Sequence, residues 1–152
     1  MGVNIIKGDL IKLAKEGEFD IIAHGANCQN IMGAGIAKEI VANFYSAFEA
    51  DKLFPIPVGS PQRLGCFSGA AFNNLYVLNF YTQFNTGKNF ELNALEMCLE
   101  KLHLTGMLKG GKTLGLPKIG CGIGGGNWEE VKELITNFAL KYNYNITIVD
   151  YE

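Results

Sequence analysis

Residues 24–40 read HGANCQNIMGAGIAKEI, and they connect a short apolar run to a segment with helical spacing. The run FDIIAHG (19–25) is apolar, ends at a glycine and has the length of a strand. Beyond Gly33 and Gly35, the apolar residues of 36–48 recur on one helical face. The stretch therefore predicts a strand, a glycine loop and a helix, the alternation that is typical of an α/β protein.

A second stretch with the same order lies closer to the carboxyl terminus. KTLGLPKIG (112–120) predicts a short strand that Pro117 stops, and GCGIGGG (120–126) follows it. NWEEVKELITNFALKY (127–142) then predicts a helix with Asn127 as its N-cap and a glutamate in the capping-box position. Both glycine segments follow strands, so we expect both at the edge where the carboxyl ends of parallel strands meet and where α/β proteins bind ligands.

The glycines of these two segments suit a phosphorylated ligand. Glycine lets the backbone take a positive φ and approach a ligand closely, and a helix amino terminus offers unpaired N–H groups to an anion. Together the loops predict a cradle for a diphosphate; in the alternative interpretation, the glycines only permit tight turns. Neither loop is a Walker A sequence or a complete G-x-G-x-x-G, which disfavours ordinary nucleoside-triphosphate and dinucleotide sites.

The rest of the chain continues the alternation as a single domain of residues 1–152. The segment 54–65, punctuated by Pro and Gly, predicts an ordered loop without helix. Asn73 and Asn74 predict the turn of an antiparallel hairpin. Further strands are expected at 3–8, 66–72, 75–81 and 145–151, and a further helix over 92–102. The pattern predicts an α/β sandwich whose mixed sheet is covered by helices on both faces.

Composition excludes several classes of protein. The chain has 152 residues, 48% hydrophobic and 18% charged, with a net charge of −2 and scattered basic residues. A protein that grips nucleic acid electrostatically would show a basic face instead. No apolar run approaches the ~18 residues of a membrane span, so we expect a soluble cytoplasmic protein. Four separated cysteines and two histidines predict reduced thiols, no metal site and no bound cofactor.

Three motifs carry a family resemblance along essentially the whole chain. They are GDL (8–10), AHGANC with MGAGIAKEI (23–28 and 32–40), and LPKIGCGIGGGNWEEV (116–131). In this order and spacing the sequence resembles a macrodomain, an ADP-ribose-binding family. It is most similar to the branch that contains ADP-ribose-1″-phosphate phosphatases and terminal ADP-ribose protein glycohydrolases. The resemblance implies a three-layer α/β/α fold around a six-stranded mixed sheet, an ADP-ribose cleft across its top, and a monomer.

The resemblance also implies roles for single residues. Asp9 matches the acid that accepts a hydrogen bond from the adenine amino group, Leu10 supports the base, and Asn27 lies beside the distal ribose. The alternatives are that Asp9 caps the turn or helix after the first strand and that Asn27 satisfies only its own loop. The two phosphate loops match Gly33, Ala34, Gly35 and Ile36, and Gly120, Cys121, Gly122, Ile123 and Gly124. Gly8, Met32, Pro117, Ile119 and Tyr151 complete the expected ligand-binding set.

The chain departs from the glycohydrolase relatives at both residues that their chemistry uses. Their lysine position falls on Gln83 or Phe84, with Lys88 several residues later, and their aspartate position falls on Gly124. An imidazole, with its ordinary pKa near ~6.5, suits proton transfer at neutral pH. His24 therefore becomes the candidate general acid or nucleophile, or else a histidine that only satisfies its loop.

The leading function is hydrolysis of ADP-ribose 1″-phosphate to ADP-ribose and phosphate, with His24 and Asn27 as catalytic residues. One alternative is a non-catalytic ADP-ribose reader. Another is a de-ADP-ribosylase that removes ADP-ribose from protein or nucleic-acid adducts, the only form in which we expect a nucleic-acid partner. Cys121 is a further conceivable nucleophile, although its place in the motif favours loop packing.

Overall fold

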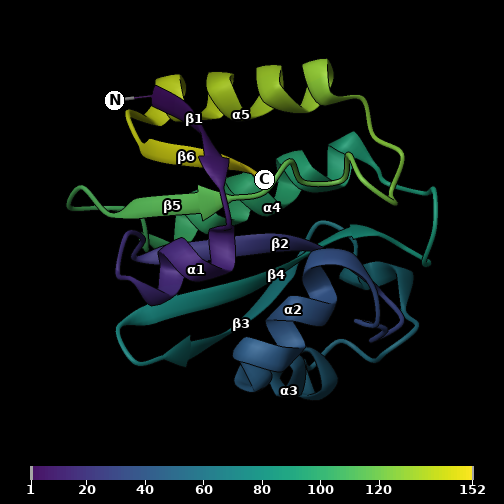
Figure 1. The fold of residues 1–152 in the computed structure, drawn as a ribbon. Helices are drawn as coiled ribbons and strands as arrows, with labels where there is room; N and C mark the ends of the chain where they lie inside the picture. Colours follow the sequence, from purple (N-terminus) through teal and green to yellow (C-terminus); the bar gives the residue numbers. More distant parts are fainter. Residues whose placement is uncertain (1, 152) are drawn as a thin grey trace.

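One six-stranded sheet organises the computed structural model, which describes residues 2–151 (Figure 1). The strand order is β1-β6-β5-β2-β4-β3, and every neighbouring pair is parallel except β3 with β4. The strands are β1 (Gly2–Gly8), β2 (Ile21–Asn27), β3 (Phe67–Phe72), β4 (Leu75–Gln83), β5 (Thr113–Leu116) and β6 (Asn145–Tyr151). The expected six-stranded mixed sheet is therefore confirmed.

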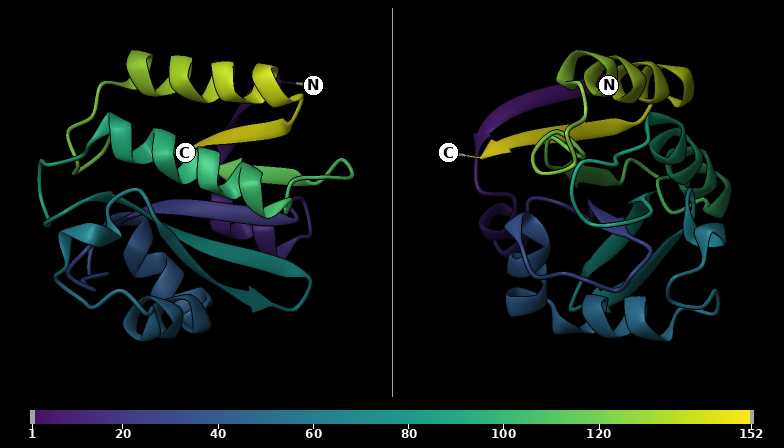
Figure 2. Two further views of the ribbon diagram at one scale, coloured as in Figure 1. Left: turned by 180° about the vertical axis from the view of Figure 1, so that it is seen from behind. Right: turned by 90° about the vertical axis from the view of Figure 1, so that its right-hand side faces the viewer.

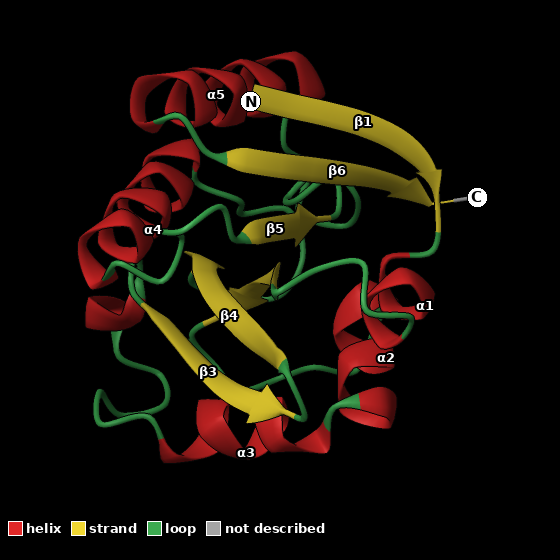
Figure 3. Cartoon of the chain, turned by 90° about the vertical axis from the view of Figure 1, so that its left-hand side faces the viewer, coloured by secondary structure: helices red, strands yellow, loops and turns green. Residues whose placement is uncertain are grey.

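Helices cover both faces of this sheet. They are α1 (Leu10–Lys15), α2 (Gly35–Asn43), α3 (Tyr45–Leu53), α4 (Leu92–Thr105) and α5 (Trp128–Tyr142). Figures 2 and 3 show α4 and α5 on one face and α1 and α2 on the other, with α3 beside β3. The three layers follow from crossover connections, which carry the chain from one parallel strand to the next over a face.

Each helical layer buries its own apolar stripe against the sheet. On the α4–α5 face, the fully buried Leu95, Leu99 and Ile135 pack with the sheet residue Leu114. On the α1–α2 face, the core contains Ile22, Ile40 and Phe44. The periodic leucines of α4 and the apolar positions of α5 therefore lie where their helical spacing predicts.

One predicted helix is wrong in its extent, because the segment 36–48 divides into α2 and α3. Phe44 lies between the two helices with φ −137° and ψ 65°, which is not helical. Its ring is fully buried and meets the Phe72 ring edge-on at 5.0 Å. The change of direction at Phe44 lets α3 turn beneath the β3–β4 hairpin, where Ala47 is fully buried.

The segment 54–65 also differs from its prediction, because it contains a short 3-10 helix, η1 (Pro61–Arg63). Pro61 occupies the first position, where its fixed φ is favourable, and the Ser60 hydroxyl accepts from the Gln62 N–H. The hairpin turn is confirmed, with Asn73 at φ 53°. Asn127 is confirmed as the N-cap of α5, since its side chain accepts from the Glu130 N–H at 3.2 Å.

Candidate ligand-binding site

The two glycine segments meet at one edge of the sheet because the strands that precede them, β2 and β5, are neighbours. We call residues 28–35 the first glycine loop and residues 117–127 the second glycine loop. A Cβ placed on Gly35 would lie 3.9 Å from Cδ1 of Ile123, so the loops approach each other directly. The right-hand view of Figure 2 looks onto this edge. The predicted juxtaposition is therefore present in the structure.

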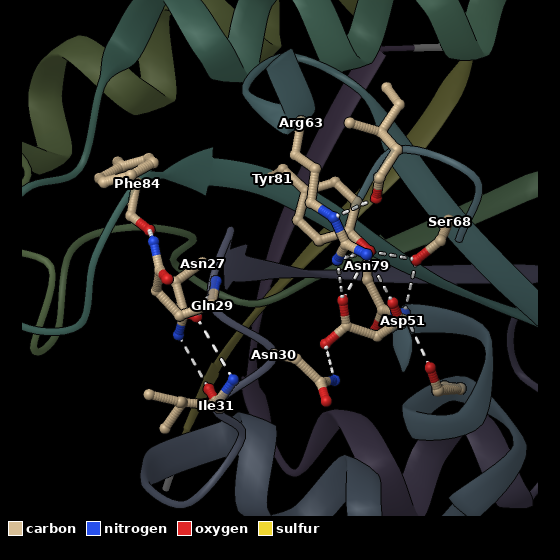
Figure 4. A network of polar contacts seen from close by, with 12 residues as sticks. Asn27, Gln29, Asn30, Ile31, Asp51, Arg63, Ser68, Asn79, Tyr81 and Phe84 are labelled. Atoms are coloured by element: carbon tan, nitrogen blue, oxygen red, sulfur yellow. Dashed lines mark hydrogen bonds and ion pairs between the residues drawn. The ribbon is translucent and has the colours of Figure 1, made fainter. Parts of the chain in front are cut away.

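Asn27 folds the first glycine loop through its side chain (Figure 4). Its Nδ2 donates to the carbonyl of Ile31 at 2.8 Å, and its Oδ1 accepts from the N–H of Gln29 at 3.0 Å and of Ile31 at 3.4 Å. Asn27 thus organises its own loop, which was the alternative interpretation. One amide hydrogen has no partner among the described residues, so Asn27 can still donate one further hydrogen bond.

The first glycine loop ends at the amino terminus of α2, where the backbone N–H groups have no side-chain cap. Ala34 is the N-cap of α2 and offers no side-chain bond to the first turn, so the N–H groups there are uncapped. A Cβ on Gly33 would meet no atom within 4 Å, whereas Met32 is 6% exposed and packs into the core with Ile36. The motif therefore combines an apolar anchor with an open glycine beside a helix amino terminus, an arrangement suited to an anion.

The second glycine loop is wrapped around the ring of Phe90. A Cβ on Gly120, which has φ +76°, would overlap that ring, and one on Gly126 would lie 2.7 Å from it. The Gly126 N–H donates to the carbonyl of Gly120 at 2.7 Å and closes the turn. Ile119 is buried in the core beneath. Sequence reasoning missed Phe90, because nothing local marks a residue that far from the loop as its support.

These differences separate glycines that the fold requires from glycines whose Cβ would enter open space. Gly120→Ala should destabilise the fold by about 2 kcal/mol or more, through an unfavourable positive φ and overlap with Phe90. Gly122→Ala, in the same loop, should change stability by less than about 0.5 kcal/mol, since its Cβ would enter open space. Urea unfolding of both variants measures the difference, and equal losses would contradict this assignment.

The residues expected at the adenine end lie along the same edge of the sheet, at β1 and β6. Gly8 pairs in register with Tyr151, a residue that is 79% exposed. Oδ1 of Asp9 caps α1 by accepting from the N–H of Ile11 at 3.0 Å and of Lys12 at 3.2 Å. Its Oδ2 has no partner among the described residues. Leu10 is buried in the core, so its side chain supports the loop from beneath.

The positions of the glycohydrolase lysine and aspartate also come together. A Cβ on Gly124 would lie 2.9 Å from Oε1 of Gln83, which favours Gln83 over Phe84 as the matching position. Gln83 is neutral, and its Nε2 donates to the carbonyls of Asn85 and Gly87. Lys88 is exposed, with its stem against Gly125. At the two expected positions the chain therefore has an amide and a glycine, neither of which can act as a nucleophile or an acid.

His24 is buried completely in β2, and its hydrogen bonds fix its tautomer. Its Nε2 lies 2.7 Å from Oδ1 of Asn79, whose Nδ2 donates to Ser68 and to the carbonyl of Ala47. Because the amide nitrogen donates, Oδ1 must accept, and Nε2 of His24 carries the proton. Its Nδ1 is then a bare lone pair, buried without a partner. Burial lowers the pKa of His24, so the ring is neutral.

The protonation and burial of the His24 ring limit the proton transfer that it could perform. The free ring nitrogen carries no proton, so it suits a base rather than the general acid that was expected. No part of the side chain is exposed, and no ligand atom can touch the ring in this conformation. Cys121, the other candidate nucleophile, is partly buried, and burial raises the pKa of its thiol.

Other features of the structure lie apart from this edge. Two hollows of about 310 and 260 Å³ lie at the opposite edge of the sheet, lined by Leu108–Lys112 with Tyr142–Asn145 and by residues that include Asp20 and Tyr76. Within residues 2–151, His, Cys, Asp and Glu side chains form no group that could hold a metal ion. None of the helices described is long and apolar enough to cross a membrane.

Comparison with known proteins gives a consistent result. The Macro domain family model matches residues 23–135. An uncharacterized 17.5 kDa protein from the tk-vs intergenic region of Enterobacteria phage T4 is 40% identical over 157 residues, covering 100% of this chain and 98% of that protein. The macrodomain of Thermus aquaticus DarG has a TM-score of 0.74 at 22% identity, covering 99% of this chain and 97% of that one. Thermosipho africanus DarTG in complex with ADP-ribose has a TM-score of 0.76 at 19% identity, covering 97% of this chain and 41% of that one.

Proposed function

The chain belongs to the macrodomain family, and we propose that it binds ADP-ribose along the carboxyl edge of its sheet. One observation supports the proposal above all. The two glycine loops follow neighbouring strands and approach each other, and Asp9 lies further along the same carboxyl edge of the sheet. DarTG from Thermosipho africanus, which shares the fold, was solved with this ligand.

In this proposal, each part of the ligand contacts a different group of atoms. The diphosphate lies between the loops, where Gly33 and Gly122 leave open space. Backbone N–H groups there donate hydrogen bonds to the negatively charged phosphates. The adenine amino group donates to Oδ2 of Asp9, and the distal ribose reaches the spare amide hydrogen of Asn27. The ligand therefore spans the ends of four adjacent strands, from β1 to β2.

Asp9→Ser tests the adenine contact without removing the helix cap. Serine caps helices about as well as aspartate, so stability should change by less than about 0.5 kcal/mol. Loss of the charged acceptor should weaken ADP-ribose binding by about 1.5–3 kcal/mol. Calorimetric titration of both proteins measures the effect. Unchanged affinity would leave Asp9 as a cap alone.

The candidate reaction is hydrolysis of ADP-ribose 1″-phosphate. A water oxygen attacks the phosphorus, the bond to the ribose oxygen breaks, and that oxygen takes up the proton that the water releases. The observation that favours it is the replacement of the lysine–aspartate pair by Gln83 and Gly124 in a site that keeps both phosphate loops. Nδ1 of His24 would accept a proton from the attacking water if the ring became accessible.

A phosphate-release assay on ADP-ribose 1″-phosphate decides between this reaction and its rivals. Turnover supports the phosphatase, and saturable ADP-ribose binding without turnover makes the protein a reader. Release of ADP-ribose from a modified protein or oligonucleotide, without phosphate release, makes it a de-ADP-ribosylase.

His24→Gln separates the structural role of His24 from proton transfer. The glutamine amide can still donate to Asn79, so we expect ADP-ribose affinity within about 3-fold of wild type, because a group used only in the transition state adds little to ground-state binding. If His24 transfers the proton, phosphate release should fall by ~10²–10⁴-fold. An unchanged rate would assign the reaction to water held by the loops.

The same variant should alter the pH dependence of stability. The pKa of His24 is lowered in the folded protein from its usual 6.5, so the unfolded chain binds more protons at acid pH. The free energy of unfolding of the wild type should therefore fall as the pH drops below 6.5, and His24→Gln should lack this contribution. Urea titrations at several pH values measure it. Parallel curves for the two proteins would contradict the buried neutral ring.

A further inference from the structure

A completely buried ion pair lies behind the first glycine loop. Asp51, on α3, and Arg63, on η1, both have 0% exposure, and NH1 of Arg63 meets Oδ1 of Asp51 at 2.7 Å. Arg63 also donates to the carbonyls of Asp51 and Ile56, and its guanidinium lies over the rings of Phe54 and Tyr81. It is the only arginine in the chain.

This pair ends a hydrogen-bonded chain with a defined direction. Nε2 of His24 donates to Asn79, Asn79 to Ser68, Ser68 to Tyr81, and Tyr81 to Oδ1 of Asp51 at 2.7 Å. Burial raises the pKa of Tyr81, which keeps its proton available to the carboxylate. Each link is therefore oriented toward the charge on Asp51.

The other carboxylate oxygen of Asp51 leaves the core and holds the first glycine loop. Nδ2 of Asn30 donates to Oδ2 of Asp51 at 2.7 Å, the bond visible at the lower centre of Figure 4. Asn30 has φ 58°, a conformation that asparagine tolerates better than most residues. It lies between Asn27, which fixes the start of the loop, and the buried Met32, which anchors its middle to the core.

Stability alone does not account for this ion pair. Buried pairs gain little net free energy over apolar residues of similar volume, because desolvation offsets the attraction. A carboxylate in the last turn of α3 is also disfavoured by the helix dipole. The ion pair does hold the buried carboxylate of Asp51 in place as a hydrogen-bond acceptor for Asn30, in the first glycine loop.

We propose that Asp51 is a positioning residue for the ligand-binding site, acting through Asn30 to hold the first glycine loop in its anion-binding conformation. The inference rests on the proposed ADP-ribose binding for its functional meaning. Asp51 does not touch the ligand. It fixes the loop backbone ahead of Gly33, so that the N–H groups there and at the start of α2 point at the diphosphate before it binds.

Asn30→Asp is the direct test, because it keeps the size and the tolerance of positive φ but sets one carboxylate against another. We expect ADP-ribose affinity to fall about tenfold or more, equivalent to about 1.4 kcal/mol. Asn73→Asp is the matched control, since Asn73 has φ 53° in the exposed β3–β4 turn and the same charge is added there. Its affinity should match wild type. Equal affinities for Asn30→Asp and wild type would overturn the proposal.

Two further measurements separate positioning from general damage to the fold. Asn30→Gly keeps the tolerance of positive φ and adds no charge, but it loses the bond to Oδ2 of Asp51, so its affinity should also fall below that of wild type. Hydrogen exchange of the unliganded proteins should be faster in Asn30→Asp for the peptide covering 28–35 and unchanged for α4 and α5. Unaltered exchange in that peptide overturns the positioning role, even if wild type binds no ADP-ribose and the proposed function itself fails.

Discussion

Gly122→Glu is expected to abolish ADP-ribose binding while the protein stays folded. Gly122 has no positive φ, and a side chain there would enter open space, so the backbone tolerates the change. The new carboxylate would lie where we propose that the ligand phosphates approach the second glycine loop. Like charges in contact cost several kcal/mol, so affinity should fall by more than about 100-fold. Calorimetric titration measures the loss, and circular dichroism verifies the fold.

Gly122→Gln is the control that separates charge from bulk in this experiment. It adds a side chain of nearly the same shape without the negative charge, so its loss of affinity should be smaller than that of the glutamate. Wild-type affinity in Gly122→Glu would place the phosphates away from the second glycine loop. That result would contradict the two-loop cradle.

Arg63→Met is expected to cost about 3–5 kcal/mol of folding free energy, because it leaves the buried carboxylate of Asp51 without its charge partner. Lys7→Met is the matched control. Lys7 pairs with Asp150 at 2.8 Å, but its side chain is 65% exposed, and such pairs contribute at most about 1 kcal/mol. Urea unfolding of both variants makes the comparison.

The double variant Arg63→Met with Asp51→Leu checks the cause of that loss. With both charges removed, no unpaired ion is left in the core, so much of the stability should return. If Arg63→Met alone were as stable as wild type, the ion pair would not be buried as the structure has it.

The strands and helices could be predicted from the sequence where glycines, prolines and hydrophobic periodicity indicated the same boundaries. Gly33 and Gly35 after an apolar run, and the proline-stopped strand before GCGIGGG, predicted both loops at the carboxyl edge of the sheet, and the structure adds that their strands, β2 and β5, are neighbours. The break at Phe44 was not predictable, because 36–48 keeps its helical spacing through that residue. Contact with Phe72, which is distant in sequence, decides the change of direction.

The residues that support the candidate site were less predictable from the sequence than the elements of the fold. Asp9 and Asn27 were each given a ligand role and a structural role, and the structure shows the structural one. Asp51 and Arg63 carried no signal, because charged residues are ordinarily solvated and their pairing depends on tertiary packing. The burial of His24 was equally hidden, since a strand covered on both faces gives no periodicity that separates its two sides.

The central claim is that the two facing glycine loops bind ADP-ribose, and calorimetric titration of the wild-type protein beside Gly33→Val tests it most directly. Gly33 has no positive φ and leaves open space, so the valine variant should fold normally. Its side chain would occupy the position that we propose for the diphosphate. We predict saturable binding at a single site in the wild type and no saturable heat in the variant. Equal binding by both proteins, or none by a folded wild type, would contradict the account.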